Sequence, residues 1–201
     1  FFTRKSNFRN QKRNTNRTQF YLRYAAELDG CAPVYLYNVP LFTSGIAPDT
    51  ALELLGTGEF AGINDSSGCQ GYFARLREAA GRQPFTLLAG DDALYARARA
   101  AGADGVVSGA AAAVPELVLA LDNAIRSGTR AALLEARLLE FTGWCNRFPV
   151  PFGVKAALEI RGLPAGPPSL PLAPGNRALL AEFREWFRGW LPDVLREAAD
   201  D

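Results

Sequence analysis

Short apolar runs alternate with helix-like segments through the first two thirds of this chain. The strand-like runs are 33–37, 60–64, 85–89 and 105–108, and the helix-like segments that follow them are 48–55, 70–80, 92–101 and 115–127. A glycine comes at or soon after the end of each helix-like segment, as is common at helix C-termini. Short strands that alternate with helices of about ten residues indicate a parallel sheet covered by helices. The pattern therefore predicts an α/β fold.

The strand-like runs stop after Gly128, and the remainder of the chain is helical in pattern. Helix-like segments are expected at 130–144, 152–160 and 176–190, with a proline-rich connector at 162–175. Proline lacks an N–H and disfavours helix and interior strand, so the connector should lie on the surface. Three regions are predicted: an arm over 1–17, a domain of four βα units over 18–128, and a C-terminal helical region over 129–201.

Composition limits the chemistry. The chain of 201 residues is 48% hydrophobic and contains no histidine. The absence of histidine excludes Ser-His and Cys-His catalytic pairs and the commonest metal ligand. Three widely spaced cysteines form no CxxC pair, which argues against a zinc site and a disulfide framework. No run approaches the roughly 20 apolar residues of a membrane span, and a reducing cytoplasm is the expected location.

Positive charge is concentrated at the start of the sequence. Residues 1–23 hold seven of the 22 basic residues and no acid, with several aromatic residues among them. Such a segment could follow nucleic-acid phosphates and stack on bases. A solvated tail is the more common origin of a charge run, and it is the favoured interpretation.

Four motifs carry a resemblance to a known family. They read VYLYNVP at Val34–Pro40, FAGINDSSG at Phe60–Gly68, LLAGDD at Leu87–Asp92 and GADGVVSG at Gly102–Gly109. In this order and spacing they resemble the second half of the barrel of the dihydrodipicolinate synthase and N-acetylneuraminate lyase family. The resemblance implies a partial (β/α)₈ TIM barrel of about four βα units with a C-terminal helical extension. A closed barrel of this kind needs eight strands and about 250 residues.

The resemblance also implies the chemistry of a class I aldolase. Members hold pyruvate as a Schiff base on a lysine that ends the AGI strand, and the matching position here is Asn64. The tyrosine of the YNVP motif, here Tyr37, relays protons in the family; the alternative is a tyrosine that merely packs at the end of a strand. An amide nitrogen is not a nucleophile, so Asn64 cannot form an imine. The only lysines are Lys5, Lys12 and Lys155, and none ends a predicted barrel strand.

The family match extends to substrate-binding positions. Asn38, Gly90 and Val107 follow or end neighbouring strands and are predicted to line the keto-acid site, because reacting groups in parallel barrels lie where strands end. The family uses no catalytic metal, and neither a metal nor a cofactor is expected. Ser66 or Ser67 is interpreted as the cap of the following helix. The hydroxyl pair with which the family holds the keto-acid carboxylate belongs to the other half of the barrel.

Three functions remain open at this stage. The first is a keto-acid lyase or aldolase of this family acting on a pyruvate-type substrate, expected to be degenerate because Asn64 holds the lysine position and the first half of the barrel is absent. The second is a non-catalytic homologue that binds a small acid or acts structurally. The third is nucleic-acid binding through the basic arm. The family resemblance also implies a homo-oligomer.

Overall fold

The computed structural model describes residues 17–28, 30–167 and 171–199. Within these limits the chain forms two compact units. Unit 1 runs to Asp91 and includes Ala101–Val107, and unit 2 consists of Asp92–Ala100 and the chain from Ser108 onward. The predicted arm over 1–17 lies outside the described residues except for Arg17. The predicted region boundaries at 17 and 128 stay a prediction.

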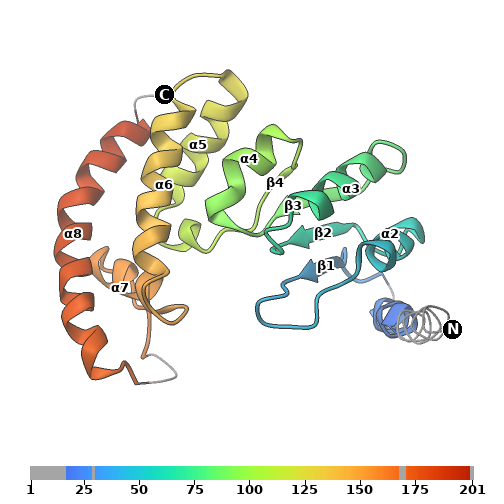
Figure 1. Ribbon diagram of the computed structural model, residues 1–201, viewed down its shortest axis with the longest axis horizontal. Helices are drawn as coiled ribbons and strands as arrows, with labels where there is room; N and C mark the ends of the chain where they lie inside the picture. Colours follow the sequence, from blue (N-terminus) through green and yellow to red (C-terminus); the bar gives the residue numbers. More distant parts are fainter. Residues whose placement is uncertain (1–16, 29, 168–170, 200–201) are drawn as a thin grey trace, which may run out of the picture. The chain divides into compact units, whose positions relative to one another are not determined.

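Unit 1 is built on one parallel sheet (Figure 1). Its four strands lie in chain order and are β1 (Tyr35–Asn38), β2 (Gly62–Asp65), β3 (Thr86–Ala89) and β4 (Gly105–Val106). Each strand pairs in parallel with the next. The predicted parallel α/β arrangement is confirmed, although β4 is only two residues long.

The two faces of this sheet have different surroundings. Leu36, Ile63 and Leu87 lie in a buried apolar core together with residues of the unit's helices. The helices are a first one over 17–27, α2 (Pro48–Gly56) and α3 (Gln70–Ala80), which lie along one side of the sheet (Figure 1). Side chains alternate between the faces of a strand. Tyr35 and Tyr37 therefore face the other side, where they are exposed.

Gly62 permits the close packing of the first three strands. A Cβ at this position would collide with the Thr86 carbonyl oxygen and lie 2.8 Å from the Tyr35 ring. Because one obstacle is backbone, the collision could not be relieved by a rotamer change. Only glycine fits at the start of β2.

Unit 2 is helical. Its elements are η1 (Asp92–Leu94), α4 (Tyr95–Ala100), η2 (Ala110–Ala112), α5 (Pro115–Ser127), α6 (Ala131–Cys145), α7 (Phe152–Ile160) and α8 (Pro174–Ala199). α5 begins with a proline at its first position and ends at Gly128, whose φ of 79° is left-handed. These are the expected residues at the two ends of a helix. α5 and α7 match their predicted ranges.

α8 is longer than the sequence predicts. We expected a helix over 176–190, but it continues through Pro192 to Ala199. A proline inside a helix removes one backbone hydrogen bond and costs about 3 kcal/mol. Packing on both sides of the proline offsets this cost, since Trp190 and Val194 are buried.

Aromatic rings join α6 and α8. Phe141 of α6 lies within 5.7–6.5 Å, between ring centroids, of Phe183, Phe187 and Trp190 of α8. Phe141, Phe183 and Phe187 have no exposed surface. These rings form the aromatic core between α6 and α8.

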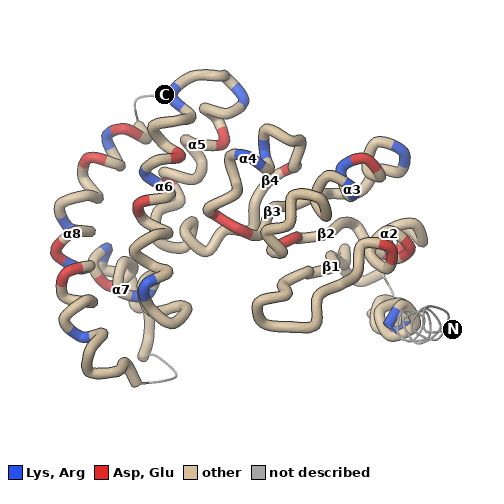
Figure 2. The backbone as a smooth tube through the Cα atoms, viewed as in Figure 1, with Lys and Arg blue, Asp and Glu red and all other residues tan. Residues whose placement is uncertain are grey.

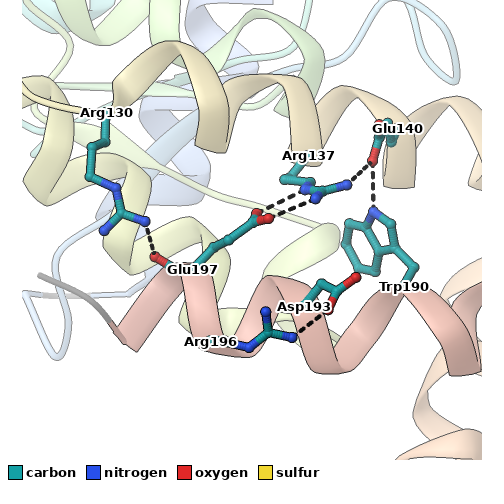
Figure 3. Close-up of polar contacts among 7 residues, drawn as sticks. All are labelled: Arg130, Arg137, Glu140, Trp190, Asp193, Arg196 and Glu197. Carbon is teal, nitrogen blue, oxygen red and sulfur yellow. Dashed lines mark hydrogen bonds and ion pairs between the residues drawn. The ribbon is translucent and has the colours of Figure 1, made fainter.

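Polar contacts fasten the same two helices (Figure 3). Arg137 of α6 donates two hydrogen bonds to the Glu197 carboxylate, at 2.8 and 2.6 Å. Arg130 donates to the Glu197 backbone carbonyl, and the Trp190 indole donates to Glu140. Burial of the rings and this bidentate pair explain why α8 runs past Pro192. Among the described helices, none has the length and apolar character needed to cross a bilayer.

Candidate functional site

The carboxyl ends of the four strands form one edge of the unit 1 sheet. Pairing sets Asn38 beside Asp65, Asp65 beside Ala89, and Ala89 beside Val106. The strands are parallel, so the residues that end them gather at this edge. The predicted site residues Tyr37, Asn38, Asn64, Gly90 and Val107 all lie at or next to it.

Tyr37 and Asn64 are direct neighbours across β1 and β2. Residues paired in this way extend to the same face of the sheet, on strands about 4.8 Å apart. Tyr37 is 56% exposed, whereas Asn64 is only 7% exposed. The side-chain oxygen of Asn64 is buried and has no hydrogen-bond partner among the residues that the structure describes. A buried amide oxygen without a partner is costly, and this one faces the side of the sheet that bears the exposed tyrosine.

Gly90 lies against Asn64. A Cβ at position 90 would come within 2.6 Å of the Asn64 side-chain oxygen and would also collide with the Ser66 hydroxyl. The Gly90 amide donates to the Asp65 carbonyl (2.9 Å), and the Ser66 hydroxyl donates to the Gly90 carbonyl (3.0 Å). Any side chain here would displace Asn64 or Ser66, so glycine keeps the space beside the Asn64 amide open.

Asn38 lies on the opposite face from Tyr37. It is almost fully buried, and both ends of its amide are bonded within the chain. Its nitrogen donates to Asp65 Oδ1 (2.7 Å), and its oxygen accepts from the Ile46 amide (2.9 Å). Asn38 therefore ties the ends of β1 and β2 together and fixes the loop that follows β1. Its predicted contact with substrate stays a prediction.

Asp65 ends β2 and holds a network of hydrogen bonds at the sheet edge, a role that its position in the sequence does not predict. Its carboxylate accepts bonds from Asn38, from the Ser67 amide (3.2 Å) and from the Ser67 hydroxyl (3.0 Å). Burial raises the pKa of this carboxyl, and the bonds from Asn38 and Ser67 act in the opposite direction. An aspartate directly after a strand and before two serines was the available signal.

The expected capping role of Ser66 and Ser67 is wrong. α3 begins at Gln70, its N-cap residue is Cys69, and no side chain caps it. Ser66 bonds to Gly90, and Ser67 bonds to Asp65 and accepts from the Cys69 amide. Both hydroxyls are used to hold the loop after β2, because the chain turns there before the helix begins.

Val107 follows β4, with its amide bonded to the Ala89 carbonyl (2.8 Å) and its side chain 52% exposed. Lysine is absent from the described part of unit 1. Lys155 belongs to unit 2, where its ammonium group donates to the carbonyls of Gly166 and Pro167 (3.4 and 3.0 Å). No cluster of three or more His, Cys, Asp or Glu that could hold a metal occurs in the ranges that the structure describes.

Known proteins share this sequence pattern. The dihydrodipicolinate synthetase family model matches residues 8–187. A 4-hydroxy-tetrahydrodipicolinate synthase from Methanothrix thermoacetophila is 35% identical over 171 residues, which cover 84% of this chain and 55% of that protein. An uncharacterized DapA-like lyase from Halobacterium salinarum is 35% identical over 161 residues, covering 79% and 52%. The chain spans about half the length of the curated relatives it matches.

Solved structures share the fold. The 4-hydroxy-tetrahydrodipicolinate synthase of Methylacidiphilum fumariolicum SolV superposes with a TM-score of 0.77 at 29% identity, covering 90% of this chain and 62% of that one. YagE of E. coli K12, in complex with pyruvate, gives 0.76 at 24% identity, covering 88% and 61%. A catalytic lysine mutant of Ruminococcus gnavus sialic acid aldolase gives 0.76 at 22% identity, covering 90% and 62%.

These matches agree with the architecture of unit 1. Four parallel strands in chain order, each followed by helix, form part of a (β/α)₈ barrel, and the predicted fold class is confirmed. The family match extends across both units. The chain belongs to the dihydrodipicolinate synthetase family.

Proposed function

We propose that this chain, a member of a lyase and aldolase family, binds a keto acid but cannot form a Schiff base with it. The observation that carries the proposal is Asn64, whose side chain stands between Tyr37 and Gly90 where the family's lysine is expected. An imine needs a primary amine, and an amide nitrogen supplies no nucleophilic lone pair. Binding of a small keto acid such as pyruvate is retained, and covalent catalysis is not.

The ligand would lie beside Tyr37, Asn64 and Gly90 at the carboxyl edge. The Asn64 amide can hydrogen-bond a carbonyl or a carboxylate, and the tyrosine hydroxyl can donate to the same oxygen. The Asn64 side-chain oxygen has no hydrogen-bond partner among the described residues. A keto acid such as pyruvate carries only acceptor oxygens, so the Asn64 nitrogen would donate to it and a water would satisfy the Asn64 oxygen. Tyr37, Asn64 and Gly90 are all uncharged, so we expect a dissociation constant near the millimolar range, about −4 kcal/mol.

The named relatives support this choice of ligand. YagE was solved with pyruvate bound, and the sialic acid aldolase of Ruminococcus gnavus has a catalytic lysine. In a relative with lysine at position 64, burial would lower the pKa of the amine and favour its attack on a carbonyl. Asparagine retains the position and the hydrogen bonding but removes that step.

A titration with pyruvate followed by amide NMR tests the proposal. We expect saturable shifts at 37–38, 64–66, 90 and 107, and loss of these shifts in Tyr37→Phe. Tyr24→Phe is a matched control, because Tyr24 is exposed to a similar degree (57%) but lies on the first helix. Saturable shifts confined to other parts of the chain, or no shifts at millimolar pyruvate, would contradict the proposal.

The remaining expectations depend on other parts of the molecule. A cytoplasmic location and a homo-oligomer stay predictions. Apart from Arg17, which donates to the Gly45 carbonyl, the basic arm over 1–17 lies outside the described residues, and nucleic-acid binding through it stays a prediction.

A further inference from the structure

One buried charge in the described part of the chain has no partner of opposite sign. Asp65, which ends β2, is 7% exposed, and neither an arginine nor a lysine among the described residues pairs with it. The four strands contain no Lys or Arg, and in Figure 2 they carry no blue segment, whereas α3 does. Burial of a charge is costly unless the charge is paired, and an unpaired group is often neutralised instead. This carboxylate can be neutralised by a proton.

The hydrogen bonds of Asp65 show which of its oxygens can carry that proton. Oδ1 accepts from the Asn38 side-chain nitrogen (2.7 Å) and from the Ser67 backbone N–H (3.2 Å), and both of these groups can only donate. Oδ2 accepts from the Ser67 hydroxyl (3.0 Å), which can either donate or accept. The same hydroxyl accepts from the Cys69 amide (3.2 Å) and has a second lone pair. A proton on Oδ2 would therefore reverse one hydrogen bond and break none.

Among the described residues, the titratable group that faces Asp65 from α3 is Tyr72. Burial raises the pKa of the Tyr72 hydroxyl, and the charge of Asp65 raises it further, so this hydroxyl stays protonated at neutral pH. Tyr21 of the first helix and Arg75 of α3 also act on Tyr72, and Arg75 is paired with the exposed Asp49. The pKa of Asp65 itself is raised by burial and lowered by its hydrogen bonds. The charge at this point therefore changes through Asp65.

Asp65 adjoins the residues at which the keto acid is proposed to bind. It follows Asn64 directly in β2, and its backbone carbonyl accepts from the Gly90 amide (2.9 Å). Asn38, which donates to the Asp65 carboxylate, follows Tyr37 in β1. Consecutive side chains lie on opposite faces of a strand, so a ligand carboxylate bonded to Asn64 would lie within about 10 Å of the Asp65 carboxylate. At that distance and an effective dielectric constant of about 20, two like charges weaken binding by about one order of magnitude.

We propose that Asp65 is a positioning residue whose protonation is coupled to keto-acid binding, so that the site takes up one proton from solvent with each ligand anion. The inference rests on the proposed function, because it concerns the same ligand site. With the proton on Oδ2, the carboxyl group keeps its bonds to Asn38 and Ser67 and holds the strand ends in place without repelling the anion. With Asp65 ionised, the bonds remain but the anion is repelled. The coupling is reciprocal, so bound ligand in turn favours the protonated form of Asp65.

The dissociation constant of pyruvate as a function of pH, followed by amide NMR at 64–66 and 90, tests the coupling. In the wild type we expect the affinity to fall about tenfold as the pH rises from about 4 to about 8. Asp65→Asn imitates the protonated form, because its side-chain oxygen accepts as Oδ1 does and its nitrogen donates to Ser67. It should bind pyruvate at every pH with the low-pH affinity of the wild type. Asp49→Asn is the matched control, since the Asp49 side chain is 81% exposed, and it should keep the pH dependence of the wild type.

A neutral ligand provides a second test that needs no variant. Pyruvamide, the amide of pyruvate, carries no charge for Asp65 to repel. Its affinity for the wild type should therefore stay constant over the same pH range, with circular dichroism used to verify the fold at each pH. This comparison decides the matter even where Asp65→Asn does not fold.

Two results would overturn the coupling and leave the proposed function standing. One is saturable pyruvate binding by the wild type with an affinity that does not change with pH. The other is a pH dependence that persists in Asp65→Asn or that pyruvamide shares, because it would then arise from another group. Absence of saturable pyruvate binding at every pH would instead contradict the proposed function, and the coupling with it.

Discussion

The two units of this protein bury their apolar surface in different ways. In unit 2, each long helix places its apolar stripe against another helix, and Phe141, Phe183 and Phe187 are fully enclosed. In unit 1, the helices cover one face of the sheet, and the other face is left with exposed tyrosines. α8 completes the core of unit 2, whereas the sheet of unit 1 keeps one face that the helices of that unit do not cover.

The polar side chains of the two units also differ in how fully they are paired. In unit 2 they form charged pairs, such as Arg137 with Glu197 and Arg161 with Glu116. At the strand ends of unit 1 they form a network of neutral groups around Asp65, and within the described ranges no group bonds to the Asn64 oxygen. The charged pairs of unit 2 stabilise the packing of its helices, while the Asn64 oxygen at the edge of unit 1 can still accept a hydrogen bond.

The largest expected effect is in the aromatic cluster of unit 2. Phe183→Ala should lower the free energy of unfolding by about 3–5 kcal/mol, because the ring is fully buried and its removal leaves a cavity. Leu119→Ala, at an exposed position of α5, should change it by less than about 0.5 kcal/mol. Urea unfolding measures both. Equal effects would show that the ring cluster is not the core of unit 2.

A smaller effect is expected from the tight strand packing of unit 1. Gly62→Ala introduces a Cβ against the Thr86 carbonyl and should destabilise by about 1–3 kcal/mol. The matched change Gly71→Ala on α3 meets no atom within 4 Å and should be neutral or stabilise by up to about 1 kcal/mol. The same urea experiment compares the two variants. If Gly62→Ala were as stable as the wild type, the strands could not be as close at this point as described.

An effect of similar size is expected from the bidentate pair between α6 and α8. Arg137→Ala removes two charge-assisted bonds to Glu197 and should cost about 1.5–3 kcal/mol. Arg196→Ala breaks an exposed pair with Asp193 on the same helix and should cost only about 0.3–0.5 kcal/mol. If the two substitutions cost the same in chemical denaturation, the pair in Figure 3 would have no special part in holding α8.

The smallest effects concern pH, and their signs are opposite in the two units. Hydrogen bonds from Arg137 lower the pKa of Glu197, so its contribution is present above the ordinary glutamate pKa and is lost as the pH falls through the lowered value. Burial raises the pKa of Asp65, so its contribution is greatest at low pH and is lost as the pH rises through the raised value.

Melting temperatures between about pH 3 and 7 separate the two contributions. Relative to the wild type, Asp65→Asn should gain stability as the pH rises, and Arg137→Gln should lose it. A pH-independent difference for either variant would contradict the assigned cause of its shift.

Much of the fold was predictable because its signals are local. Proline and glycine mark the ends of α5, and the ranges that the apolar periodicity predicts for α3 and α7 match the observed ones. The extension of α8 was not predictable, because contacts of Trp190 and Glu197 with the distant helix α6 override a local proline.

The site was predictable in position but not in its bonding. The motifs placed Tyr37, Asn64 and Gly90 at neighbouring strand ends, and pairing of the strands brings them together. Asn38 lies on the helix side of the sheet and bonds Asp65 there. This bond requires both residues to lie on the same face at the sheet edge. No local sequence signal specifies that partnership.

The most direct measurement is the intact mass of the protein after incubation with pyruvate and borohydride, made on wild type and Asn64→Lys side by side. We expect no adduct on folded wild type and a pyruvate-sized adduct at residue 64 of the variant, because lysine restores a nucleophile at a buried strand end. An adduct on the wild-type chain would mean that another amine forms the imine and that Asn64 does not abolish Schiff-base chemistry.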